Sequence, residues 1–189
     1  FDPADPQIPA EADRPAIDRW ILSRLDAVTE VVTTSLDGYE PLAATGPLSE
    51  LIDDLSNWYV RRSRRRFWDG DHSALSTLHH CLKVVTQVMA PFTPFITERV
   101  WQDLFSADAE SVHLTDWPAW DDAAIDDTLR DQVELTRRLV ELGRAARATS
   151  GVGLGLSVVA AVARLHGGTL TLEEREDSRG GRSAAPVFT

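Results

Sequence analysis

Sulfur is almost absent from this sequence. Its 189 residues include one cysteine, Cys81, and one methionine, Met89. A single cysteine excludes a disulfide within the chain and a zinc site built from cysteines. Because Cys81 lies in an apolar helical run, HHCLKVVTQVMA, we expect a buried and unreactive thiol, and we expect no metal site. Because Met89 is far from the first residue, we expect the chain to be part of a longer or processed protein.

Long apolar runs are also missing. No stretch reaches the roughly 18 apolar residues that a membrane span needs, and the chain does not open with a signal peptide. Its 43% apolar content and moderate charge are typical of a globular protein. We therefore expect a cytoplasmic protein that has no membrane partner.

Positive charge is scarce and concentrated in one place. The net charge is −11, yet residues 61–68 contain five arginines and no acid. A global charge argument would exclude nucleic acid, but a local basic patch is the better guide to binding. Trp58, Tyr59 and Trp68 lie among these arginines. Guanidinium groups that bind phosphate and flat rings that stack on bases are the usual components of single-stranded RNA recognition.

The stretch Leu48–Trp68 reads as one amphipathic helix. At roughly 100° per residue, Leu48, Leu51, Leu55 and Tyr59 share an apolar face. A solvated basic turn at a helix C-terminus is the simpler reading of the arginines. The RNA reading assigns base-edge contact to Asn57 and base or phosphate contact to Arg61. It assigns backbone phosphate to Arg62, Arg64 and Arg65. The stacking face is offered by Trp58 or Trp68. Arg62 and Arg66 point near the apolar stripe, so for both of them packing or pairing with a core carboxylate rivals RNA contact.

Periodicity and capping predict five helices and an all-α antiparallel bundle. Residues 1–12 read as a linker and residues 13–150 as the bundle. The first helix begins at an Asp13 cap and ends at Gly38, and the second runs over 41–68 with a kink or fresh start at Pro47. The others are a helix from a Ser73 cap to Ala90, one over 95–104 capped by Thr93, and one over 126–148. Ser111–Trp117 reads as extended, with room for one short strand.

Two sets of apolar residues in the later helices are predicted to face inward. In the fourth helix they are Phe95, Ile96, Val100, Trp101 and Leu104, and in the fifth they are Leu129, Val133, Leu135, Leu139 and Leu142.

Several long blocks resemble isoleucyl-tRNA synthetases. DDLSNWYVRRSRRRFW, at 53–68, is similar to a helix of their anticodon-binding region, and DRWILSRL, MAPFTPFITERVWQDL, SVHLTDWP and LTRRLVELGRAARATSGV follow the family in order. The resemblance covers about residues 1–152 and implies the all-α, class I anticodon-binding fold. It implies isoleucine tRNA as partner, not DNA, and a catalytic domain preceding this region. The intact family enzyme charges its tRNA with isoleucine using ATP and magnesium; this chain lacks the ATP motifs and should be inactive alone.

The tail, residues 151–189, resembles another family. GVGLGLSVVAAVARLHGGTLTLEE is similar to the last glycine box, helix and strand of a histidine-kinase ATPase domain, with Gly151, Gly153 and Gly155 in its loop. The asparagine helix and the Asp-x-Gly-x-Gly segment that complete that ATP site are absent, so we expect a non-functional remnant. Two alternatives to tRNA binding stay open: this kinase remnant, and a helical module whose arginines meet an acidic protein.

Overall fold

The computed structural model describes residues 2–3, 5–150, 170–176 and 182–188. The chain divides into two compact units, Phe1–Arg130 and Asp131–Thr189. The predicted helix 154–164 of the tail and its three loop glycines lie outside the described residues.

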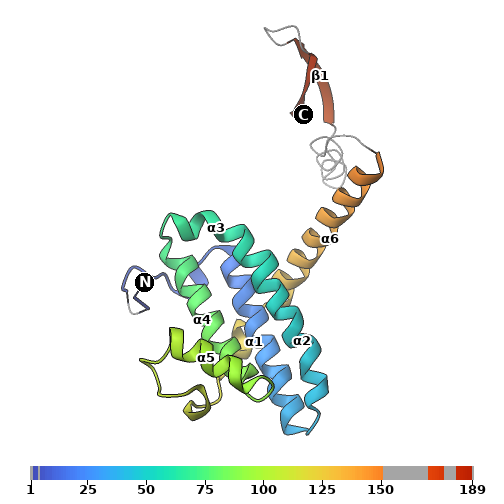
Figure 1. Cartoon of the computed structure of the whole chain (residues 1–189). Coiled ribbons are helices and arrows are strands. Elements are labelled where there is room, and N and C mark those ends of the chain that lie inside the picture. The colour runs from blue at the N-terminus through green and yellow to red at the C-terminus, as the bar shows by residue number, and fades with distance from the viewer. Residues whose placement is uncertain (1, 4, 151–169, 177–181, 189) are drawn as a thin grey trace. The chain divides into compact units, whose positions relative to one another are not determined.

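The first unit is a bundle built around one long helix. That helix, α1 (Ala16–Asp37), lies between α2 (Pro41–Asp53) and α4 (His72–Met89), as Figure 1 shows, and packs against both. A π-helical segment, η2 (Asp54–Val60), leads from α2 into α3 (Arg61–Trp68), and α5 (Pro94–Leu104) packs on α4. Three 3-10 turns complete this unit: η1 (Glu11–Asp13), η3 (Val112–Leu114) and η4 (Asp122–Ala124).

Among the described residues, α1 contributes more buried apolar side chains to the core than any other helix. Trp20, Ile21, Leu25 and Val32 of α1 are almost completely buried. A smaller cluster joins α5 to the segment that follows it, where Trp101 packs on Phe105 and donates its indole hydrogen bond to the Ala109 carbonyl at 2.9 Å. The prediction of an all-α bundle is confirmed for this unit.

The remaining elements belong wholly or mostly to the second unit. Helix α6 (Asp127–Ser150) begins at the end of the first unit and continues into the second. Strands β1 (Leu170–Glu176) and β2 (Arg182–Phe188) form an antiparallel pair in which Leu170 is opposite Phe188. A strand after the glycine loop was predicted, and β1 confirms it. No helix among the described residues is long and apolar enough to cross a membrane.

Two predicted N-caps are wrong, and of the two alternatives at Pro47 the fresh start is excluded. Asp13 lies in η1, and Pro15 occupies the N-cap position of α1. Helix α2 continues through Pro47 without a fresh start, because its buried residues Ala44, Leu48 and Leu51 hold it against α1 while one backbone hydrogen bond is lost. Asp71, not Ser73, caps α4, since its carboxylate accepts the Ala74 backbone N–H at 3.0 Å.

Helix α5 buries a different face from the predicted one. Trp101 is buried as expected, but Phe95 is 90% exposed, Ile96 and Leu104 are exposed as well, and Val100 is half-buried. Thr97 is buried instead. Its hydroxyl donates to the Thr93 carbonyl at 2.9 Å, so burial does not leave this polar group without a hydrogen bond.

Two other regions also differ from the prediction. In α6, Leu135 and Leu142 are exposed, and Leu129, Val133 and Leu139 are half-buried. Ser111–Trp117 contains the 3-10 turn η3 in place of a strand, because the Ser111 hydroxyl accepts the His113 backbone N–H and starts a turn.

Candidate functional site

The arginine-rich segment changes helix type just before its first arginine. Its buried residues Leu51, Leu55, Tyr59 and Ser63 recur every four positions. In an ideal α-helix each such step turns the side chain by about 40° too far, so over twelve residues the stripe would drift by about 120° away from the core. The wider turns of η2 reduce this drift, because π-helical hydrogen bonds enclose one more residue per turn. The buried stripe therefore stays on one side and four of the five arginines of α3 on the other.

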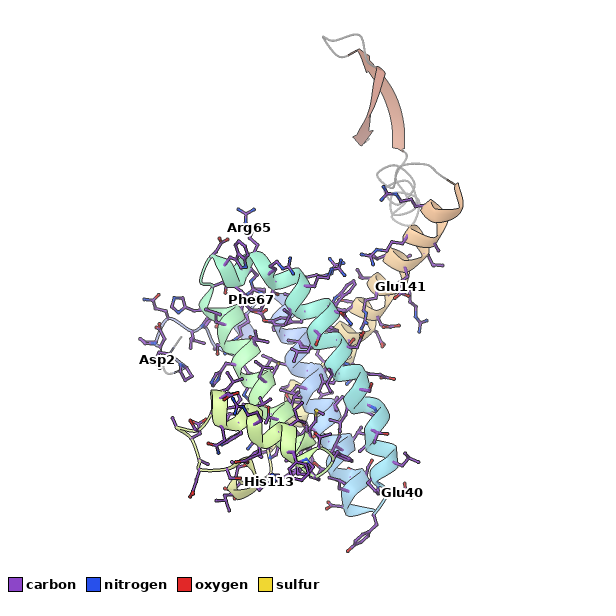
Figure 2. The ribbon with its side chains drawn as sticks, viewed as in Figure 1. Asp2, Glu40, Arg65, Phe67, His113 and Glu141 are labelled. Atoms are coloured by element: carbon purple, nitrogen blue, oxygen red, sulfur yellow. The ribbon has the colours of Figure 1, made fainter. Side chains whose placement is uncertain are left out.

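Four of the five arginines of α3 are exposed. They are Arg61, Arg62, Arg64 and Arg65. Figure 2 shows the Arg65 side chain extending outward from α3; it is 93% exposed and pairs with Asp69 at 3.5 Å, one turn ahead. The side chains of Arg61, Arg62 and Arg64 form no ion pair with any carboxylate of the described residues. Within that part of the chain three guanidinium groups therefore have no acidic partner, and a fourth is held only by an exposed pair that is weak in water.

Arg66 is the exception among the five. Its Nη1 and Nη2 donate to the two carboxylate oxygens of Asp18 at 2.6 and 2.7 Å, and its Nε donates to Asp71 at 2.9 Å. Hydrogen bonding to Asp18 raises the pKa of Arg66, and hydrogen bonding to Arg66 lowers the pKa of Asp71. Of the two alternatives stated for Arg66, pairing with a core carboxylate is the observed one.

Arg62, in contrast, is exposed at the surface. Its guanidinium lies over the Trp58 ring, 3.9 Å from the ring centroid, which is a cation–π arrangement. Trp58 is half-buried, whereas Trp68, at the last position of α3, is 86% exposed. Both tryptophans were predicted as stacking platforms. A base could stack on the exposed Trp68 ring directly, whereas on Trp58 it would first have to displace Arg62.

Asn57 is exposed on η2, and its side-chain amide donates to Asp53 at 2.5 Å. A carboxylate can only accept at neutral pH, so this contact identifies the amide nitrogen as the atom that faces Asp53. The carbonyl oxygen of Asn57 then faces away from Asp53 and remains able to accept a hydrogen bond.

Asp18 and Asp71, which hold Arg66, were not predicted from the sequence. One feature could have revealed Asp18. It shares a helix face with Ile21 and Leu25, and an acid on the apolar face of a helix requires a charged or hydrogen-bonding partner.

The described residues contain no group of three or more histidine, cysteine or acidic side chains that could hold a metal ion. Cys81 is buried as predicted, and this burial raises the pKa of its thiol. Burial also lowers the pKa of His79 and His80. The chemistry available at the exposed face of η2 and α3 is therefore recognition of anions and flat rings, through Arg61, Arg64, Arg65 and Trp68.

Comparison with protein families matches residues 18–162 to the anticodon-binding domain of tRNA ligase. An isoleucine–tRNA ligase of Streptomyces coelicolor is 61% identical over 148 residues, which are 76% of this chain and 14% of that protein. An isoleucine–tRNA ligase of Thermobifida fusca is 53% identical over 149 residues, with the same coverage of both chains. One from Thermus thermophilus is 42% identical over 154 residues, 76% of this chain and 15% of the relative. The chain thus spans about a seventh of the length of these relatives.

Proposed function

The chain belongs to the family of anticodon-binding domains of tRNA ligases, and we propose from this that it binds the anticodon stem-loop of an isoleucine tRNA. The observation that carries the proposal is the exposed face of α3. Over two helical turns it presents the guanidinium groups of Arg61, Arg64 and Arg65 together with the open Trp68 ring. Guanidinium forks match phosphate geometry, and an exposed indole can stack on an unpaired base.

Within this role the residues divide by chemistry. Arg64 and Arg65 contact backbone phosphates, which position the loop without reading its sequence. Asn57 reads a base edge, and Arg61, one turn further on, contacts a base or its phosphate. Arg62 reaches phosphate from its place over Trp58. Trp68 is the first stacking platform, and Trp58 becomes available only when Arg62 moves aside.

The complete protein, on this proposal, is an isoleucine–tRNA ligase of the cytoplasm. Its activity needs isoleucine, ATP and magnesium, and the catalytic machinery lies outside this chain. The helical bundle binds the anticodon end of the tRNA, so that the acceptor end of the tRNA reaches a catalytic domain that precedes Phe1. The chain by itself should bind tRNA and catalyse nothing.

Binding to labelled tRNA at several salt concentrations tests the proposal. The full chain is titrated against isoleucine tRNA and against the same tRNA with an altered anticodon. Arg64→Gln should weaken binding to both tRNAs equally and reduce the slope of log affinity against log salt by roughly 0.7–0.9, the value for one lost phosphate contact. Asn57→Ala should instead lower the affinity ratio between the two tRNAs by about fivefold or more, since a base contact contributes about 1–3 kcal/mol of discrimination.

Arg99→Gln is the matched control. Arg99 lies on α5, is 78% exposed and pairs with Asp103 at 3.0 Å one turn ahead, which closely resembles the pair of Arg65 with Asp69. Its loss should leave affinity and salt slope unchanged. If the wild-type chain binds polyphosphate as well as tRNA and does not distinguish the two tRNAs, the chain is a general polyanion or acidic-protein binder and the proposal is wrong.

A further inference from the structure

One buried carboxylate joins all the elements around α3. Asp18 of α1 has no exposed surface and accepts four hydrogen bonds. Two come from Arg66 of α3, one comes from the Tyr59 hydroxyl of η2 at 3.0 Å, and one comes from the Ser73 hydroxyl of α4 at 2.6 Å. Both oxygens of Asp18 are therefore saturated by donors from three different elements.

Arg66 is held on its other side as well. Asp71, in the turn that leads into α4, accepts from its Nε at 2.9 Å and from its Nη2 at 3.3 Å, and also caps α4. Four of the five N–H groups of the guanidinium are thus used within the protein. Two carboxylates surround one cation, so Arg66 offers neither net positive charge nor a free fork to a phosphate.

Few other side chains attach α3 to the bundle. It forms the last eight residues of the helical stretch that continues from α2 through η2, and Ser63 is its only buried residue. The Ser63 hydroxyl has no hydrogen-bond partner among the described residues, and Phe67 touches the bundle through an edge-on contact with Tyr59 at 6.1 Å between ring centroids. The last turns of a helix fray unless tertiary contacts hold them, and repulsion among the neighbouring arginines weakens α3 further.

We infer that Arg66, clamped by Asp18 and Asp71, is the positioning residue for tRNA binding: it fixes the direction of α3 and thereby aims Arg61, Arg64 and Trp68. The inference rests on the proposed function of that face. A bidentate pair fixes direction because both N–H groups of the fork must align with both oxygens of the carboxylate. A lysine at the same position keeps the charge but cannot make this planar contact.

The test uses two variants of the full chain, Arg66→Lys and Asp18→Asn, at a temperature where tryptophan fluorescence shows both to be folded. Each should weaken binding to isoleucine tRNA by about two- to thirtyfold, the usual range for residues that act without touching the ligand. Each should leave the salt slope unchanged, because no phosphate contact is lost. In the NMR spectrum of the wild-type arginine Nη–H groups, those of Arg66 should exchange slowly with water and those of Arg64 fast, and the Arg66 Nη–H signals should lose their protection in Asp18→Asn.

Asp18→Asn separates the explanations, since Asp18 is fully buried and cannot contact RNA. If Arg66 were a phosphate contact, Arg66→Lys would keep its affinity and Asp18→Asn would bind as well as the wild type or better. If the cluster served stability alone, both variants would unfold more easily yet bind normally while folded. Either result overturns the inference. Failure of the proposed function would look different, because the wild-type chain itself would then not distinguish the two tRNAs.

Discussion

Replacing Arg66 by methionine tests how strongly the buried cluster stabilises the bundle. The substitution keeps an aliphatic side chain but removes both fork contacts to Asp18 and both contacts to Asp71. Asp18 then remains fully buried with only the neutral donors Tyr59 and Ser73. Adding up the four lost bonds separately would overstate the effect, since they share one guanidinium and one desolvation cost.

The expected loss follows from the cost of an unpaired buried charge. Removing one partner of a buried ion pair usually costs about 3–5 kcal/mol. The side chain of Arg66 is 23% exposed, so water can partly replace it, and we expect a loss of about 3 kcal/mol in the free energy of unfolding. A domain of ordinary stability, about 5–15 kcal/mol, would remain folded after this loss.

Urea unfolding followed by tryptophan fluorescence measures this loss selectively. All six tryptophans lie before Arg130, so the signal reports on the first unit alone. Arg65→Met is the control: its side chain is 93% exposed and its ion pair is weak, so it should cost less than about 1 kcal/mol. In the double variant Asp18→Asn/Arg66→Met the unpaired negative charge of Asp18 is removed as well. The free energy of unfolding should therefore be at least about 1 kcal/mol higher than that of Arg66→Met. Equal losses in Arg66→Met and Arg65→Met, or no recovery in the double variant, would refute the argument.

Three further expectations concern the core and the tail. Burial raises the pKa of Asp26 from 3.8 to about 6, so its ionisation weakens the folded state as the pH rises from about 4 to above 6. Asp26→Asn should therefore stabilise the protein at pH 7, by about 1–2 kcal/mol after allowance for the partial exposure of the carboxyl group, and the gain in urea unfolding should disappear below about pH 4. Deletion of residues 153–189 should leave the cooperative tryptophan transition in place, since the core of the first unit is complete without them; loss of the transition would show that the tail is part of that core. Calorimetry should detect no magnesium-dependent ATP binding, and micromolar binding abolished by changing Gly153 and Gly155 would contradict this.

Sequence periodicity was sufficient to locate most of the helices, although not all of their N-caps. Turn residues and apolar spacing predicted helices close to α1, α4 and α5, and Gly38 as the end of the first. Gly70, with φ of +72°, allows the turn that separates α3 from α4. The concentration of arginine beside tryptophan was visible in the sequence because neighbours on a helix remain neighbours in space.

The tertiary structure decided which side of each helix is buried. A helical wheel of 100° per residue placed Arg62 and Arg66 in similar positions near the apolar stripe, but in the structure Arg62 stacks on Trp58 whereas Arg66 reaches Asp18. The partner of Arg66 lies 48 positions away in the sequence, and no local pattern encodes that distance.

Thr97 likewise displaced larger apolar residues of α5 from the core, since a hydroxyl that is hydrogen-bonded within its own helix costs little to bury. The sequence by itself thus determined the helices and the residues available for recognition. Long-range contacts alone determined which arginine became part of the scaffold and which ones remained free for a ligand.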